Sequence, residues 1–352
     1  MTRPVLARAF VAVVVLAGGL LAGAPPANAH AVTGVKPTNY KSEIVGISGG
    51  TVDVHLLDLG RRIALANRSR TDIIVLGYTG EPWLRVGGRG VFENEYSFSA
   101  YEERQRRGSV SDPPPEPSKA VGPPRWRRTG DGHTLVWRDR RTRFEGPTPD
   151  QVRRAPREGH PIVPRWVVEL RRGATPLTIE GRISYVPPPS PLPWALIAVA
   201  LFGATVATVR STRWPLLLSH CLALLIAVDV VHSFANAAVS GGSLVTQAGG
   251  VLRGGSFGVT AWILGAGSIS LLRRGTDSGL ILAGSSALMI AFYGGVTDAS
   301  TLTTSQVPSA LSPFLLRSAV AVSLGLGFGI ATALAYQGTR GRRQRPATTV
   351  RG

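Results

Sequence analysis

The pattern of apolar and polar positions changes once along this chain, at a proline-rich stretch between Val186 and Trp194. Before it, short apolar stretches alternate with polar residues and are interrupted by glycine, proline, asparagine and aspartate. After it, apolar runs of membrane length follow one another with few charges. Five of the seven residues from 187 to 193 are prolines, which lack a backbone donor, so we expect an extended linker there. The pattern predicts two units of different construction.

The segment 30–186 has the period of half-buried strands. Val52, Val54 and Leu56 alternate with Asp53 and His55, as expected where one face of a strand is buried. Further strands are predicted at 62–67, 72–77, 84–92, 134–144, 164–170 and 177–186, and 111–124 is predicted as a surface excursion. Short strands in this number, without a helical period, predict an all-β sandwich of the immunoglobulin-like type.

Beyond the linker, the apolar runs predict an α-helical transmembrane domain over 194–337. Its five helices are expected at 194–209, 214–234, 254–272, 279–296 and 313–336. Each is close to the ~20 residues that cross a ~30 Å hydrocarbon core, which makes the lipid bilayer the first expected partner. Trp194 stands where an interfacial aromatic side chain would anchor the first helix.

Residues 1–29 have the pattern of a secretory signal peptide. Arg3 and Arg8 flank the start of an apolar run, and Ala27 and Ala29 form a small-residue cleavage motif. Cleavage after Ala29 would make His30 the mature N-terminus and place 30–186 outside the cytoplasm. An uncleaved membrane anchor is the alternative interpretation.

Charge supports one orientation in the membrane. The chain has 39 Lys+Arg against 21 Asp+Glu, a formal net charge of +18. In the apolar half the arginines gather between helices and in the tail 338–352: Arg210, Arg213, Arg273, Arg274, Arg340, Arg342, Arg343 and Arg345. With 30–186 outside, all of these fall on the cytoplasmic side, as the positive-inside rule requires. We therefore predict a multi-pass plasma-membrane protein with a cytoplasmic C-terminus, and no nucleic-acid partner.

The sequence offers little for catalysis. Cys221, the single cysteine, lies in an apolar run, which excludes a disulfide or a cysteine zinc site in the exported segment. No glycine-rich phosphate loop, G-x-S-x-G or H-E-x-x-H motif occurs. The remaining acidic pairs, Glu102 with Glu103 and Asp131 with Asp139, are typical of a solvated surface. We predict that the protein is not an enzyme and needs no organic cofactor.

His30 is the first candidate for metal chemistry. A mature N-terminal histidine offers its α-amine and a ring nitrogen to one ion, and with another imidazole this makes a nitrogen-rich site suited to copper. His55 and His133 are the expected partners, and His160 is a weaker one. A terminal histidine without a metal is the alternative.

Polar residues inside the predicted helices form the second candidate site. Asp229 and His232 are three residues apart and project from one helix face. A carboxylate in hydrocarbon costs a few kcal/mol, so Asp229 should face the bundle and find a partner, for which Arg317 is the expected residue. With Asp298 at the outer end of the fourth helix, these side chains predict either an ion or proton site or an ion pair that fixes helix register.

Three stretches of the exported segment resemble an actinobacterial family of uncharacterised membrane proteins with a secreted β-rich domain and a multi-helix region. They are TNYKSEI at 38–44, VLGYTGEPWLRVGGRGVFEN at 75–94 and PRWRRTGDGHTLVWRDRR at 124–141, followed by PSPLPW at 189–194. The resemblance implies the architecture and no activity. Family members tend to have histidines after the tryptophan that matches Trp137, where this chain has Arg138 and Arg140. Guanidinium cannot ligate a cation, which argues against a metal in that strand.

The layout is also similar to CopC-type copper proteins, whose membrane partner is of the CopD type, here fused into one chain. That likeness rests on His30 and the order of the parts. The leading hypothesis for function is an envelope scaffold or interaction module that presents its exported domain to an anionic envelope polymer or a protein partner. The alternative is copper binding or handling at the outer membrane face.

Overall fold

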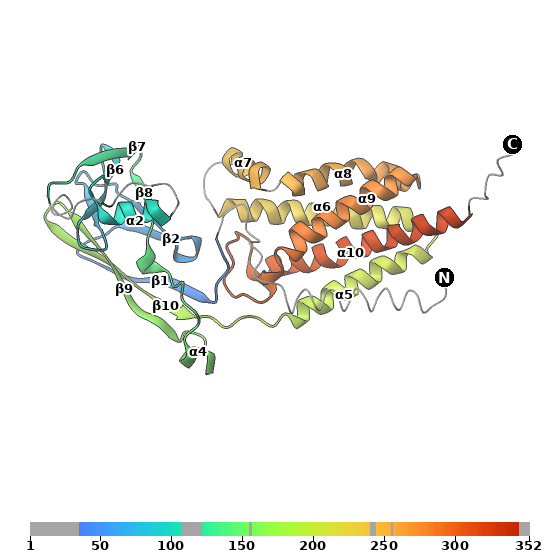
Figure 1. Cartoon of the computed structure of the whole chain (residues 1–352), viewed down its shortest axis with the longest axis horizontal. Coiled ribbons are helices and arrows are strands. Elements are labelled where there is room, and N and C mark those ends of the chain that lie inside the picture. Colours follow the sequence, from blue (N-terminus) through green and yellow to red (C-terminus); the bar gives the residue numbers. More distant parts are fainter. Residues whose placement is uncertain are drawn as a thin grey trace. The chain divides into compact units, whose positions relative to one another are not determined.

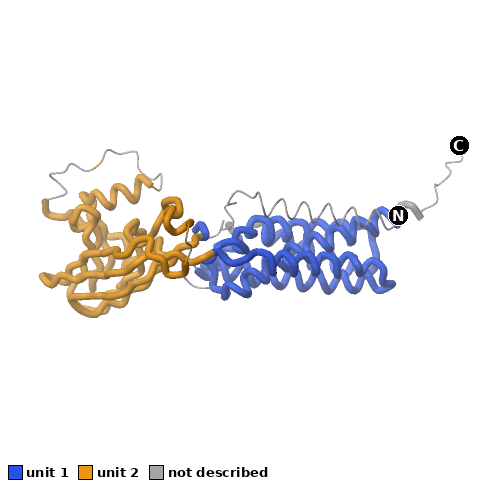
Figure 2. Tube along the Cα trace, turned by 90° about the horizontal axis from the view of Figure 1, so that it is seen from below, with its two compact units in different colours: residues 1–37, 188–352 blue, residues 38–187 orange. Residues whose placement is uncertain are grey.

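The computed structural model describes residues 35–106, 114, 122–154, 157–239, 244–254 and 256–344. The chain divides into two compact units (Figure 2). Residues Thr38–Pro187 form one, called the β unit, and the helices after Pro188 belong to the other, called the helical unit. The division falls in the proline-rich stretch, where side chains cannot build a continuous core.

The β unit consists of two antiparallel sheets, which Figure 1 shows together with a short helix. The larger sheet has seven strands in the order β1-β10-β9-β4-β5-β6-β7, and the smaller has the order β2-β3-β8. Their bounds are β1 Tyr40–Ser48, β2 Asp53–Leu57, β3 Arg62–Ala66, β4 Ile73–Leu76, β5 Pro82–Gly87, β6 Gly90–Asn94, β7 Trp126–Gly130, β8 Thr134–Arg138, β9 Pro161–Arg172 and β10 Thr175–Tyr185.

Both sheets contribute to one hydrophobic core. Ile63 and Leu65 of β3 and Trp137 of β8 are in the same buried cluster as Val75 of β4 and Val168 of β9. These positions alternate with outward-facing ones along each strand, because successive side chains of a strand point to opposite faces. The period-2 pattern in the sequence therefore reports the face that is buried.

Two strand predictions need correction. The stretch 84–92 is a hairpin of β5 and β6, because Gly90 adopts a positive φ of 111° that favours glycine and turns the chain. The strand predicted at 134–144 ends at Arg138, since the side chain of Asp139 accepts a bond from the backbone N of Arg141 and begins a 3₁₀ turn, Arg140–Thr142.

The β unit also contains elements that the sequence pattern did not predict. Strand β1 pairs with β10 at the edge of the larger sheet, and most of its side chains are not buried, so no alternation marks it. Helix α2, Phe98–Arg106, begins after Ser97, whose hydroxyl accepts a bond from the backbone N of Ala100. A shorter helix, α4, spans Asp150–Arg154. The unit is thus β-rich and not all-β.

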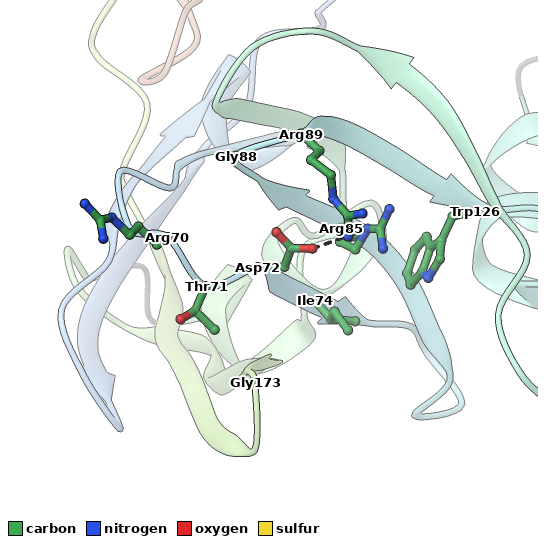
Figure 3. A pocket seen from close by; sticks show the side chains of 9 residues that line it. All are labelled: Arg70, Thr71, Asp72, Ile74, Arg85, Gly88, Arg89, Trp126 and Gly173. Atoms are coloured by element: carbon green, nitrogen blue, oxygen red, sulfur yellow. Dashed lines mark ion pairs between the residues drawn. The ribbon is translucent and has the colours of Figure 1, made fainter.

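The outer face of the larger sheet, opposite the shared core, carries a pocket (Figure 3). A cross-strand row on this face runs from Ile74 of β4 through Arg85 of β5 to Phe92 of β6. Their neighbours Ile73, Val75, Val86 and Val91 point the other way, into the core.

Among its described residues, the helical unit contains four helices long and apolar enough to cross a membrane, or five if a bent pair counts as one span. The four candidate spans are Leu192–Arg210, Trp214–Ala238, Asp277–Val296 and Pro313–Arg340, and the bent pair is Leu244–Leu252 with Phe257–Arg273, at 89° to each other. The helices involved are α5 Leu192–Ala207, α6 Trp214–Ala238, α7 Leu244–Gly254, α8 Ser256–Arg273, α9 Asp277–Ile290 and α10 Pro313–Gln344. The predicted helices correspond to α5, α6, α8, α9 and α10, while α7 was not predicted.

Small residues set the helix spacing in this unit. Helix α10 packs against α5, α6 and α9, and α8 packs against α6 and α9, as Figure 1 shows. A Cβ atom on Gly325 would lie 2.5 Å from the carbonyl oxygen of Ala198 on α5. One on Gly327 would lie 2.7 Å from the Cβ atom of Ala291. These glycines therefore allow close approach of the helices.

Candidate functional site

A cluster of titratable side chains lies inside the helical unit. Asp229 and His232 project from one face of α6, and Asp298 precedes a 3₁₀ turn, η5 Ala299–Leu302. Asp229 is 4% exposed, His232 2% and Asp298 4%. With Trp262 of α8, these three residues form what we call the buried polar cluster. Titratable groups so deeply placed among apolar helices are costly unless they have partners or a function.

His232 and Asp298 are in direct contact. The Nε2 atom of His232 lies 2.9 Å from Oδ2 of Asp298. The carboxylate does not lie along the N–H direction of the ring, so the contact lacks hydrogen-bond alignment and is an ion pair only when His232 is protonated. Such a pair can change its protonation without breaking a well-formed hydrogen bond.

Asp229 has a different partner. Its Oδ2 atom accepts a hydrogen bond of 2.7 Å from the indole Nε1 of Trp262. On its other side the chain forms a π-helix, η4 Ala291–Val296, in which a Cβ atom on Gly294 would lie 2.2 Å from Oδ1 of Asp229. A residue larger than glycine at this position would force the Asp229 carboxylate to shift. A π-helical turn of this kind often accompanies a functional site.

Several buried polar atoms around the cluster have no hydrogen-bond partner within the described residues. They are Nδ1 and Nε2 of His232, Oδ1 of Asn236, Oδ1 of Asp298, Oγ of Ser300, Oγ1 of Thr301 and Oγ of Ser323. Leaving one such group unsatisfied costs about 1–3 kcal/mol, and most proteins have only a few. Their concentration in one place indicates capacity for further hydrogen bonding at the cluster.

Arg317 does not pair with Asp229. Its Nε atom donates to the carbonyl oxygen of Thr301 and its Nη2 atom to that of Thr304, both at 3.1 Å. The backbone N of Thr301 in turn donates to the carbonyl oxygen of Asp298. Arg317 therefore holds the turn that follows Asp298, and the expected ion pair is replaced by an arginine bound to backbone carbonyls. It acts as a positioning residue.

The arrangement is suited to proton binding. Imidazole changes charge between pH 5 and 8 when unperturbed, and the two neighbouring carboxyl groups can share its proton. No group of three or more His, Cys, Asp or Glu residues within the described ranges is placed to hold a metal ion. The buried polar cluster thus offers acid–base groups, not a converging set of metal ligands.

The histidines predicted to bind copper are separated or lie outside the described residues. His55, on β2, is exposed and its Nε2 atom lies 3.0 Å from Oδ1 of Asp53. His133, in the turn before β8, is also exposed, and its carbonyl oxygen accepts a bond from the backbone N of Asn67. His160 lies in the turn before β9. His30 lies outside the described residues, so the copper prediction remains untested.

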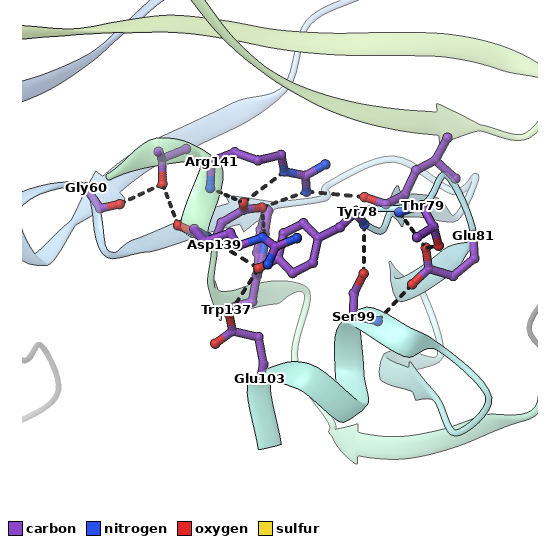
Figure 4. A network of polar contacts seen from close by, with 12 residues as sticks. Gly60, Tyr78, Thr79, Glu81, Ser99, Glu103, Trp137, Asp139 and Arg141 are labelled. Carbon is purple, nitrogen blue, oxygen red and sulfur yellow. Dashed lines mark hydrogen bonds and ion pairs between the residues drawn. The ribbon is translucent and has the colours of Figure 1, made fainter. Parts of the chain in front are cut away.

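Two of the acidic residues expected on a solvated surface, Glu103 and Asp139, are instead buried and belong to a network of polar contacts (Figure 4). Asp139 is fully buried. Its carboxylate accepts bonds from Nε1 of Trp137 at 3.0 Å and from Nε and Nη2 of Arg141 at 2.9 and 2.7 Å. Glu103 accepts a bond from the hydroxyl of Tyr78 at 3.0 Å. Burial, followed by the charge of Asp139, raises the pKa of Tyr78 well above its usual value. These groups are satisfied by one another, which favours a structural role.

Glu81 is a third buried carboxylate of this network. It accepts bonds from the backbone N of Ser99, the hydroxyl of Ser97 and the hydroxyl of Thr79. Burial alone would raise the pKa of Glu81, but these hydrogen bonds to its ionised form outweigh burial and lower the pKa to about 2. The carboxylate joins the β4–β5 turn to the start of α2 (Figure 4).

Comparison with protein-family models, with curated proteins and with solved structures gives no match. Over the residues that it describes, the structure defines a β-rich unit with two antiparallel sheets and a helical region with four to five helices long and apolar enough to cross a membrane. The resemblance to an actinobacterial family and the likeness to CopC and CopD proteins remain predictions from the sequence.

Two features of the site were missing from the sequence analysis. Trp262 was not considered, although a tryptophan inside an apolar helix usually needs an acceptor for its N–H when buried. Gly294 was not distinguished from the other glycines of the helices. Its role depends on the contact between the π-helix and Asp229 of α6. No local sequence pattern reveals a contact between two separate helices.

Proposed function

We propose that this chain is a multi-pass membrane protein, not an enzyme, whose helical unit binds a proton at the buried polar cluster. The observation that carries the proposal is the burial of Asp229, His232 and Asp298 in one place, each at most 4% exposed. An ion pair that only fixes helix packing needs two charged side chains. The third titratable group and the unsatisfied atoms nearby support a site whose protonation changes.

The imidazole of His232 is the group we assign to proton exchange. When protonated it is balanced by Asp298 at 2.9 Å, and when neutral it leaves that carboxylate to take the proton or to find another donor. Asp229 stays oriented by Trp262 in both cases. Arg317 holds the η5 turn and so keeps Asp298 in place.

An infrared measurement tests this assignment. The full-length protein in lipid nanodiscs should show a carbonyl band of a protonated carboxylic acid whose intensity depends on pH. Asp298→Asn should remove this band and His232→Gln should shift its midpoint, because each change removes one member of the pair.

His220→Gln is the matched control for this experiment. His220 is an exposed histidine on the same helix, and its Nδ1 atom lies 2.8 Å from the carbonyl oxygen of Leu216. This variant should titrate like the wild type. A band independent of pH in the wild type, or one unchanged by both cluster variants, would mean that the cluster only fixes helix packing.

The β unit is proposed to be exported, with the C-terminus in the cytoplasm. The support is the position of the arginine pairs at 210 and 213 and at 273 and 274, which the positive-inside rule assigns to the cytoplasmic side. A reporter active only in the cytoplasm should be active when fused after Arg345 and inactive when fused after Ser190. The reverse result would invert the topology.

The exported β unit is proposed as an interaction module for an anionic envelope polymer or a protein partner. Two antiparallel sheets around one core support its assignment to the immunoglobulin-like sandwiches as part of the same proposal.

Copper binding by His30 is retained as the alternative function. It requires the cleaved N-terminus, which supplies an α-amine beside the imidazole. Metal analysis of the mature protein should find one class of copper site that His30→Ala removes. Equal copper retention by wild type and variant would reject it.

A further inference from the structure

The pocket on the outer face of the larger sheet has the polar pattern of a small-ligand site (Figure 3). Its volume is about 370 Å³, at the lower end of the range of ligand pockets. The residues that line it are Arg70, Thr71, Asp72, Ile74, Arg85, Gly88, Arg89, Trp126 and Gly173. All of them belong to the β unit, and none takes part in the network around Asp139.

Arg85 is one of the arginines that line the pocket, and its guanidinium contacts two aromatic rings. Its guanidinium lies over the ring of Phe92 at 4.1 Å and over that of Trp126 at 4.9 Å. Two aromatic contacts fix the plane of the guanidinium and leave its N–H edge as the part that can bind. A fixed guanidinium loses little conformational entropy when it binds an oxyanion.

Within the described residues, one N–H group of the Arg85 guanidinium has no hydrogen-bond partner. Its Nε atom is buried without a hydrogen-bond partner in the described part of the chain. The Nε atom of Arg85 forms an ion pair with Oδ2 of Asp72. Their separation of 3.8 Å is too long for a hydrogen bond. The contact with Asp72 therefore leaves this donor unused among the described residues.

Arg89 adds a second positive charge above the pocket. It lies in the tight β5–β6 turn, and its side chain extends toward Arg85 in Figure 3, whereas Arg70 points away. Burial lowers the pKa of Arg85, the charge of Asp72 raises it, and the charge of Arg89 lowers it further. The two guanidinium groups are therefore close enough to repel each other. A bound anion would relieve their repulsion.

Asp72 and Thr71 give the pocket acceptors next to this positive edge. A carboxylate excludes a simple anion from its side of the pocket but accepts hydrogen bonds from hydroxyl groups. The complementary ligand has an oxyanion at one end and hydroxyl groups at the other. Phosphate suits guanidinium groups well, because two of its oxygens can accept the two parallel N–H bonds that one guanidinium fork donates.

We propose that this pocket binds a polyol phosphate, with the phosphate on Arg85 and Arg89 and a hydroxyl group on Asp72. The same chemistry occurs in a soluble or polymer-borne glycerol phosphate and in the headgroup of phosphatidylglycerol. The inference rests on the interaction-module part of the proposed function and is independent of the proton site in the helical unit.

Calorimetric titration of the full-length protein in phosphatidylcholine nanodiscs with glycerol 3-phosphate tests the proposal. Binding should saturate, weaken with added salt, and be stronger than that of inorganic phosphate, while glycerol should not bind. Arg89→Gln should weaken binding about tenfold, as expected for loss of one charge-assisted hydrogen bond. Arg85→Lys should weaken it at least as much, since lysine keeps the charge but loses the fork.

Arg165→Gln is the matched control, because Arg165 is an exposed arginine of the same unit that is paired with Glu180 away from the pocket lining. It should bind like the wild type. No saturable binding by the wild type, or equal losses in Arg89→Gln and Arg165→Gln, would overturn the proposal. The infrared titration of the buried polar cluster should be normal in all these variants, so failure here is distinguishable from failure of the proton site.

Varying the lipid composition of the nanodiscs distinguishes a lipid headgroup from a soluble or polymer-borne phosphate as the ligand. If the headgroup of phosphatidylglycerol occupies the pocket, adding that lipid should reduce glycerol 3-phosphate affinity more than adding equally charged phosphatidylserine. If both lipids act alike, the ligand is a soluble or polymer-borne polyol phosphate.

Discussion

Asp139→Asn should destabilise the β unit by about 3–5 kcal/mol, the usual cost of removing one partner from a buried ion pair. Asp139 is fully buried and accepts four hydrogen bonds, from Trp137, from the backbone N of Arg141 and twice from the guanidinium of Arg141. Asparagine has one acceptor oxygen and directs an NH₂ group at these donors. Arg141 would then keep a largely buried charge without compensation.

Hydrogen exchange of peptides from β8 in the full-length protein measures this loss, because exchange through opening of the unit reports its free energy. Glu180→Gln is the matched control. Its carboxylate pairs with Arg165 on the surface, where ion pairs contribute little. Equal protection of β8 in both variants would show that the Asp139 network does not stabilise the unit.

The β unit should also become unstable in acid through Glu81. Its pKa is lowered from 4.5 to about 2 by hydrogen bonds from Thr79, Ser99 and Ser97, which outweigh the opposing effect of burial. Because the folded-state pKa is below the unfolded one, this stabilisation is complete above about pH 4.5 and is lost as the pH falls toward 2. The difference corresponds to about 3 kcal/mol at neutral pH.

Glu81→Gln should remove that contribution at neutral pH and flatten the acid dependence of β-unit stability. The amide offers only one acceptor to donors from Thr79, Ser97 and Ser99. Hydrogen exchange of α2 peptides across the acid range, corrected for intrinsic rates, gives the profile. Glu158→Gln, at an exposed carboxylate in the turn before β9, should leave it unchanged. A Glu81 variant with the wild-type slope would contradict the assignment.

The sequence pattern predicted helices and strands best where the burial of a residue depends only on the element that contains it. Long apolar runs require helices in a membrane, since backbone groups there must bond within their own segment, and the positions of α5, α6, α9 and α10 follow from this. Alternation likewise marked β2, β3 and β4, because one face of each strand lies in a common core. The edge strand β1 shows little burial and therefore left no such trace.

The buried polar cluster shows where such reasoning stops. Spacing alone placed Asp229 and His232 on one face of a helix. The assumed partner, Arg317, instead bonds to backbone carbonyls, while Trp262 supplies the donor to Asp229. Opposite charge suggests many pairings in a bundle, and helix packing selects among them.

The sequence by itself determined the two-part construction, the spans and the residues whose burial needs an explanation, because hydropathy and period depend on neighbours along the chain. Only the tertiary structure decided which distant groups meet. The row Ile74, Arg85 and Phe92 depends on register between three strands, and the π-helical turn at Gly294 depends on α6. Register and helix packing are settled by the whole core at once, and both candidate sites are consequences of them.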